Sequence, residues 1–144
     1  VLANVDIRRD WPDKVLVWRA DDAERRAAAV AKLGRAILKA SDWATDPANV
    51  PRFAHHLSAP DRLALPVDVL EPILRFEIRQ GAGRPPRQIE RFVRFDRAAL
   101  RPEPAHADRI LDGMAMAGQA VPDEEMRALA RQVFRPDLFP VGAG

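Results

Sequence analysis

The pattern of apolar and polar positions divides the chain into one apolar run and a series of helical segments. Residues 15–18, Val-Leu-Val-Trp, form a nearly uninterrupted apolar run, which is typical of a strand buried on both faces of a sheet. Such a strand needs a neighbour on each side. No second segment of similar quality is present, although a weaker candidate lies near Phe92. The run therefore predicts a strand without a visible sheet.

Apolar residues spaced three and four positions apart predict helices over most of the remaining chain. The longest helix is expected to start at Asp22 or Ala23, with Asp21 as its N-cap, and to stop before Pro47. The apolar face of this helix is expected at Val30, Leu33, Ile37, Ala40 and Ala44. Further helices are expected through 51–57, at Val67, Leu70 and Leu74 after Pro66, over 107–118, and at Met126, Leu129, Ala130 and Val133 after Pro122 and Asp123. Pro72 predicts a kink or a short helix.

Turn-forming residues separate these segments. "RQGAGRPPRQ" predicts a loop, "RPEP" a rigid connector, and 140–144 a frayed tail. The expected fold is mainly α with one or two short strands, and residues 1–144 are expected to form a single helical region. The chain lacks an initial Met, and no other segment of similar quality in its sequence offers a partner strand for 15–18. We therefore expect the chain to be part of a longer polypeptide.

Charge and composition narrow the function classes. The 144 residues include 23 basic and 21 acidic side chains, and the arginines are spread along the chain among acids, so no nucleic-acid surface is predicted. No apolar run is long enough to span a membrane. The absence of cysteine excludes disulfides and thiol catalysis.

Candidate catalytic and metal-binding groups are sparse. His55 and His56 are adjacent, so on a helix their side chains point about 100° apart and do not easily share a metal, and His106 stands far along the chain. The "GAG" at 81–83 lacks the strand and helix of a phosphate loop. We therefore predict no enzyme activity, no metal and no cofactor.

Several segments taken in order resemble a known family. They are "PDKVLVWRADD", "AILKASDWATDPANVPRFAHHLSAPDRLALPVDVLEPIL", "RFVRFDRAA", "ILDGMAMAGQ" and "ALARQVFRPDLF". Together they resemble the C-terminal part of the nitrate- and bicarbonate-binding family of periplasmic solute-binding proteins of ABC transporters, which includes cytosolic nitrate-sensor paralogues. The resemblance implies the C-terminal portion of a bilobal α/β fold that closes on a small anion. The strand at 15–18 would then pair with strands of the missing N-terminal lobes.

The resemblance also implies ligand-binding residues. Lys14, in "WPDK", matches a lysine that reaches the anion, and an ammonium group offers a compact charge with three donors to an oxyanion. The alternative is a surface lysine lying beside the strand. Trp11 is a second candidate as an apolar wall of the cleft, with packing at the strand entrance as its alternative. Trp18 and Trp43 are expected in the core.

The implied function is non-enzymatic capture of nitrate or a related small oxyanion in the periplasm and delivery to an ABC permease. The alternative is a cytoplasmic nitrate-sensor-like module that holds a regulator protein. Family members carry an aromatic-rich helix of which this chain retains only Met114, Gly118 and Gln119, and this loss favours the alternative.

Overall fold

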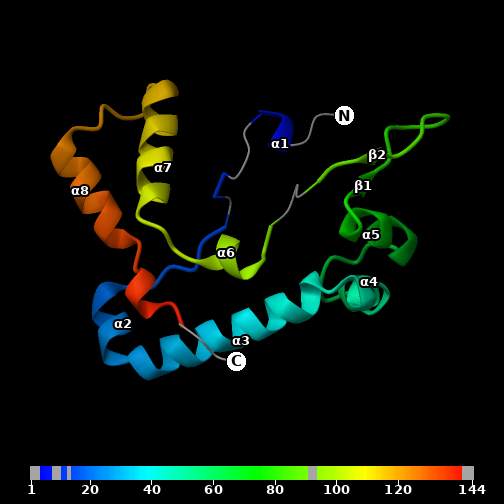
Figure 1. The fold of residues 1–144 in the computed structure, drawn as a ribbon, viewed down its shortest axis with the longest axis horizontal. Coiled ribbons are helices and arrows are strands. Elements are labelled where there is room, and N and C mark those ends of the chain that lie inside the picture. The colour runs from blue at the N-terminus through cyan, green and yellow to red at the C-terminus, as the bar shows by residue number, and fades with distance from the viewer. Residues whose placement is uncertain (1–3, 8–10, 13, 91–93, 141–144) are drawn as a thin grey trace. The chain divides into compact units, whose positions relative to one another are not determined.

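The computed structural model describes residues 4–7, 11–12, 14–90 and 94–140, which fold into two compact units (Figure 1). The first unit holds the described residues within 1–10 and 39–99, and the second holds those within 11–38 and 100–144. The single helical region expected from the sequence stays a prediction. The elements are α1 (Asn4–Ile7), α2 (Ala20–Arg25), α3 (Ala27–Thr45), the 3-10 helix η1 (Pro47–Asn49), α4 (Val50–Leu57), α5 (Val67–Leu74), β1 (Glu77–Ile78), β2 (Arg87–Gln88), α6 (Arg97–Leu100), α7 (Ala105–Met116), α8 (Glu124–Val133) and the 3-10 helix η2 (Pro136–Leu138).

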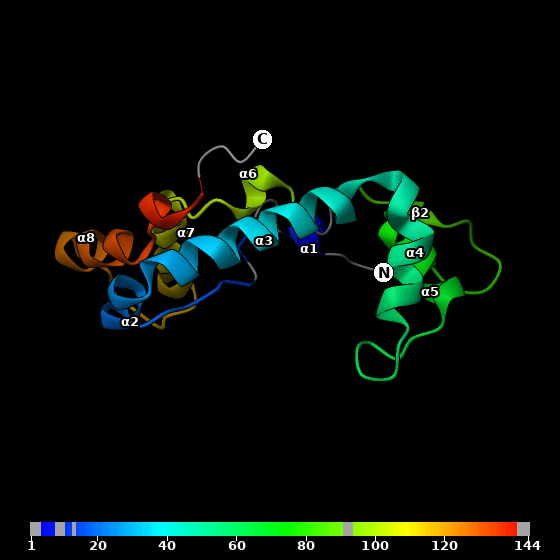
Figure 2. The ribbon, with the colours of Figure 1, turned by 90° about the horizontal axis from the view of Figure 1, so that it is seen from below.

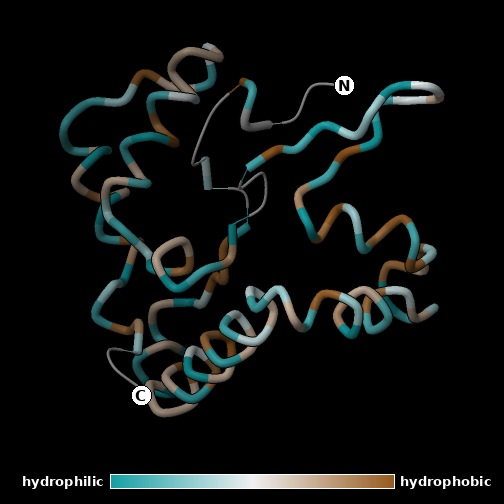
Figure 3. Tube along the Cα trace, turned by 45° about the vertical axis from the view of Figure 1, so that its right-hand side comes forward, coloured by the Kyte–Doolittle hydropathy of each residue, from teal (hydrophilic) through white to brown (hydrophobic). Residues whose placement is uncertain are grey.

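The long helix α3 forms where it was predicted, and hydrophilic and hydrophobic positions alternate along its turns (Figure 3). The predicted apolar stripe is only partly covered: Leu33 and Ala40 are exposed, and the buried residues of α3 are Leu38 and Ser41. It ends at Thr45, where the Asp46 carboxylate accepts a hydrogen bond of 2.9 Å from the Ala48 N–H and starts η1. The predicted start was wrong. Asp21 lies in the first turn of a separate helix, α2, which begins at Ala20, and α3 begins at Ala27. The Asp21 carboxylate accepts hydrogen bonds from the Arg19 and Arg25 guanidinium groups.

Helices α4 and α5 form the packed centre of the first unit and lie side by side in both ribbon views (Figures 1 and 2). Ala54 of α4 is fully buried, and Val50 and Leu70 are also buried. Helix α5 contains Pro72 and ends at Leu74, which confirms the short helix expected there.

A two-stranded antiparallel hairpin follows α5. Glu77 pairs with Gln88 and Ile78 pairs with Arg87. The connecting loop was predicted from its glycines, and Gly81 and Gly83 indeed adopt positive φ angles of 116° and 74°. The mainly helical class with two short strands is confirmed, but these strands lie outside the segments from which strands were expected. The weaker candidate near Phe92 falls outside the described residues.

The chain after the hairpin is attached to α3 by polar contacts and to α4 by an aromatic contact. Ser41, the buried polar residue of α3, donates a hydrogen bond from Oγ to the Phe95 carbonyl. Nε of Arg97 lies 2.9 Å from Oδ1 of Asp42, and this hydrogen bond lowers the pKa of the Asp42 carboxyl. The Phe95 ring meets Phe53 edge-on, with ring centroids 6.4 Å apart. These contacts fix the segment against the unit's helices.

In the second unit, α7 packs against α8 (Figures 1 and 2). Ala107 and Leu111 of α7 are buried. Helix α8 starts as predicted, because Oδ1 of Asp123 accepts a 2.8 Å hydrogen bond from the Met126 N–H. Of the tail 140–144 that was expected to be frayed, Pro140 is described and half-buried, and residues 141–144 lie outside the described part of the chain.

Charged groups form ion pairs between α7 and α8. Arg127 bonds Asp112 at 2.7 Å, and Arg131 bonds Asp108 at 2.9 Å. Most of the apolar face predicted for α8 is not packed: Ala130 is half-buried, but Met126 (41%), Leu129 (59%) and Val133 (74%) are exposed. Helix α8 therefore turns its charged face to its neighbour and its apolar face outward.

The strand predicted at 15–18 is not formed. Residues 15–17 are 62–76% exposed and belong to neither strand of the hairpin, and Trp18, expected in the core, is 36% exposed. A strand needs hydrogen-bonding neighbours, and the described residues supply none to this segment. Among the described helices, none is long and apolar enough to cross a bilayer.

Candidate functional site

An open hollow of about 360 Å3 lies where α3 meets α4 in the first unit, and it is lined by Trp43, Arg52, His55 and His56. Trp43 stands near the end of α3, and the other three side chains come from α4. Small-molecule sites commonly measure about 300–1,000 Å3, so the hollow has room for a small organic molecule.

The local fold holds the aromatic wall of this hollow in place. The Trp43 ring meets Phe53 edge-on, with centroids 5.8 Å apart, and the Arg52 guanidinium lies 5.9 Å from the Trp43 ring centroid. Asn49 between the two helices donates from Nδ2 to the Trp43 carbonyl at 2.9 Å. Phe53 and Arg52 therefore contact the indole and Asn49 holds the Trp43 backbone, while the Arg52 residue itself remains exposed.

The side chains around the hollow supply several hydrogen-bond donors and no carboxylate. The His55 carbonyl accepts from the Ser58 hydroxyl at 2.7 Å, and the His56 carbonyl accepts from the Arg62 guanidinium at 2.9 Å. Helix α4 itself carries no acidic residue. The side chains that line the hollow are thus a cationic guanidinium, two imidazoles and an indole, a set that favours an anion.

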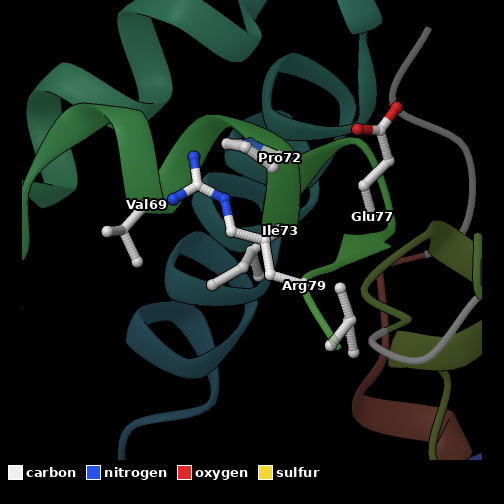
Figure 4. Close-up of a pocket in the computed structure, with 6 residues that line it drawn as sticks. Val69, Pro72, Ile73, Glu77 and Arg79 are labelled. Carbon is white, nitrogen blue, oxygen red and sulfur yellow. The ribbon is translucent and has the colours of Figure 1, made fainter. Parts of the chain in front are cut away.

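A second hollow of about 260 Å3 lies between α5 and β1 (Figure 4). Its walls are the side chains of Val69, Pro72 and Ile73, and Figure 4 shows the Arg79 guanidinium lying back over this helix while the Glu77 carboxylate points the other way. Arg79 donates to the Asp68 carbonyl at 3.4 Å. This groove is apolar with a charged rim and shows no convergent reactive groups.

The ligand-binding residues predicted from the sequence lie elsewhere. Lys14 is exposed and directly precedes the exposed run 15–17, and Trp11 is 36% exposed. Both belong to the second unit, and neither lines the two hollows described above. Their roles in ligand binding stay predictions. Trp43, expected in the core, is half-buried.

The described residues contain no group of three or more His, Asp or Glu side chains placed to hold a metal ion. The sequence reasoning considered His55 and His56 only as metal ligands and so missed the hollow. The signal that could have found it is the gathering of one arginine and two histidines on a helix without acids, just after a tryptophan.

Comparison with known proteins gives one informative match. Over 129 residues, 89% of this chain, the sequence is 28% identical to the nitrate/nitrite binding protein NrtA of Synechococcus elongatus. The chain is a distant, partial relative of NrtA. It spans 29% of the length of NrtA, less than a third. The family resemblance expected from the sequence is confirmed at this level.

The other comparisons found nothing. No family model matches the chain. No solved structure matches it. The relation to NrtA therefore rests on sequence alone, and it concerns a protein named for binding, not for catalysis.

Proposed function

We propose that this chain is part of a non-enzymatic solute-binding protein that captures nitrate or a related small oxyanion. The observation that carries the proposal is the 28% identity to NrtA over 89% of the chain. In this proposal the protein acts in the periplasm, closes two lobes around the anion and delivers it to an ABC permease. Most of the ligand cleft would come from polypeptide that corresponds to the remainder of NrtA.

In the proposal Lys14 is the anion ligand and Trp11 is an apolar wall beside it. The exposed position of Lys14 next to the apolar run 15–17 supports this role, since the run would be covered by a sheet of the complete protein. An ammonium group neutralises an oxyanion and still allows its release.

The test is a thermal-shift titration with nitrate, nitrite, bicarbonate and, as a control anion, chloride. It uses residues 1–144 and, in parallel, the natural polypeptide that contains them. A ligand that binds only the folded form raises the melting temperature, by an amount equivalent to about 2.7 kcal/mol at a hundredfold excess over Kd. We expect nitrate or one of its relatives to raise the melting temperature of the natural polypeptide, and the shorter chain to respond little.

Lys14→Met should abolish that shift, whereas the matched variant Lys32→Met, which changes another exposed lysine of the same unit, should retain it. An unchanged shift in Lys14→Met would remove Lys14 from the site. If none of the oxyanions shifts the melting temperature of the natural polypeptide more than chloride does, the proposed function is wrong.

A second candidate is a cytoplasmic sensor-like module that holds a regulator protein. The uncovered apolar face of α8, with Met126, Leu129 and Val133, favours it, because exposed apolar stripes often serve as docking surfaces. Cell fractionation distinguishes the two. Recovery of the natural polypeptide in the periplasmic fraction supports the transport role, and recovery in the cytoplasm supports the sensor role.

A further inference from the structure

The hollow lined by Trp43, Arg52, His55 and His56 combines a flat apolar wall with donors at one rim. The indole is braced by Phe53 at 5.8 Å and faces the Arg52 guanidinium at 5.9 Å. A planar ring placed against this indole would gain stacking contact without a large loss of side-chain freedom, because the Trp43 position is already set by its neighbours.

The charge of the expected ligand follows from the groups that line the hollow. None of the four lining side chains is acidic. The carbonyls of Trp43, His55 and His56 already accept hydrogen bonds from Asn49, Ser58 and Arg62. A carboxylate would find the Arg52 guanidinium, which only donates, and one N–H group from each imidazole.

The size of the hollow distinguishes this ligand from the oxyanion of the proposed function. A three-oxygen ion would fill only a small part of about 360 Å3 and would leave the indole wall uncovered. The hollow also belongs to the first unit, whereas Lys14 and Trp11 belong to the second.

We propose that the Trp43–Arg52–His55–His56 hollow binds a small organic anion that carries a planar ring, with the ring against Trp43 and its carboxylate on Arg52 and the imidazoles. The site uses residues of one unit only and does not depend on nitrate binding. Because the hollow is open and Arg52, His55 and His56 are exposed, the complex is weak, with Kd near millimolar, equivalent to about −4 kcal/mol.

The experiment is an NMR titration of the 144-residue chain with benzoate, which follows the indole N–H signals. Two matched compounds separate the two halves of the proposal: benzamide keeps the ring and loses the charge, and cyclohexanecarboxylate keeps the charge and loses the flat ring. We expect benzoate to shift the Trp43 signal saturably and the Trp18 signal little. Each matched compound should bind about tenfold more weakly, which corresponds to about 1.4 kcal/mol.

Variants then test the named residues. Arg52→Gln and His56→Gln should each weaken benzoate binding at least about fivefold, roughly 1 kcal/mol, while Arg35→Gln, which changes an exposed arginine of α3 away from the hollow, should not. Unchanged dispersion of the other indole signals verifies folding of each variant.

Three results would overturn the proposal. The first is a Trp43 signal that benzoate does not shift. The second is equal affinity for benzoate and cyclohexanecarboxylate, which would leave the indole without a role. The third is unaltered benzoate binding in Arg52→Gln and His56→Gln together, which would place the anion elsewhere. Nitrate binding by the natural polypeptide is measured separately, so its failure leaves this result standing.

Discussion

Nε of Arg131 on α8 lies 2.9 Å from Oδ2 of Asp108 on α7, and the same guanidinium reaches Oε1 of Glu124 at 3.0 Å. A second arginine, Arg127, lies 2.7 Å from Asp112 and 3.6 Å from Asp108. The two helices are thus joined by a network of charges in which one carboxylate serves two arginines. Networks of this kind contribute more than isolated surface pairs.

The network makes the α7–α8 pair sensitive to acid. Hydrogen bonding from Arg131, together with the charges of both arginines, lowers the pKa of Asp108. A carboxyl with a depressed folded-state pKa stabilises the fold above its unfolded value of about 3.9, and this contribution is lost as pH falls through the folded-state pKa. Urea unfolding followed from about pH 7 to about pH 2.5 should therefore show a decline at the acid end.

In Asp108→Asn that acid decline should be smaller, and stability near neutral pH should already be lower. Asp61→Asn, which changes an exposed loop aspartate, serves as the matched variant and should keep the wild-type profile. A wild-type acid profile in Asp108→Asn would show that Asp108 is not the group responsible.

A buried leucine of α7 and an exposed leucine of α8 should differ in how much stability their replacement by alanine costs. Leu111 is 7% exposed and Leu129 is 59% exposed, although both fall on apolar stripes of the sequence. Leu111→Ala should lower the free energy of unfolding by about 2–4 kcal/mol. Leu129→Ala should change it by less than about 0.5 kcal/mol, and chemical denaturation measures both. A large loss for Leu129→Ala would mean that α8 packs its apolar face in solution.

The contrast between Leu111 and Leu129 could not be predicted from the sequence, although the helices that carry them could. Spacing placed α3, α4, α5, α7 and α8, and the cap at Asp123, because helix starts, stops and periodicity are local properties. Which face of a helix is covered is not a local property, because it depends on the neighbouring elements. In α8 the arginines pair with carboxylates of α7, and the apolar residues that were expected to be covered are exposed. The run at 15–18 failed as a strand for the same reason, since no partner strand is described for it. The hollow at Trp43 depends on an inter-helix angle that no periodicity encodes.

The hydroxyl of Ser41 supports the chain after the hairpin. It is buried and donates to the Phe95 carbonyl, so Ser41→Ala leaves that carbonyl without its partner and should cost about 1–2 kcal/mol of unfolding free energy. Ser58→Ala removes a hydroxyl that bonds the exposed end of α4 and should cost less than about 0.5 kcal/mol. Equal costs for the two variants would contradict the structural role of Ser41.

Gly34 of α3 lies against Pro140. A Cβ atom at position 34 would come within 2.8 Å of the Pro140 Cγ, closer than van der Waals contact allows. Alanine inside a helix is favoured over glycine by about 1 kcal/mol, but here the proline must move to make room. Gly34→Ala should therefore stabilise the chain little.

In a Pro140→Ala background, where the ring is absent, Gly34→Ala should gain nearly the full helix preference of about 1 kcal/mol. Thermal unfolding of the four combinations gives the coupling between the two positions. Additive effects would indicate that Pro140 does not approach Gly34 in solution.

The uncovered Val-Leu-Val run at 15–17 has a consequence for the life of the polypeptide in the cell. Short apolar segments with strong β preference are the sequences that self-associate and that quality-control proteases and chaperones recognise. Abundance and shelf life should therefore depend on how quickly this run is sequestered after synthesis, and adding one charge within it should improve recovery at high concentration.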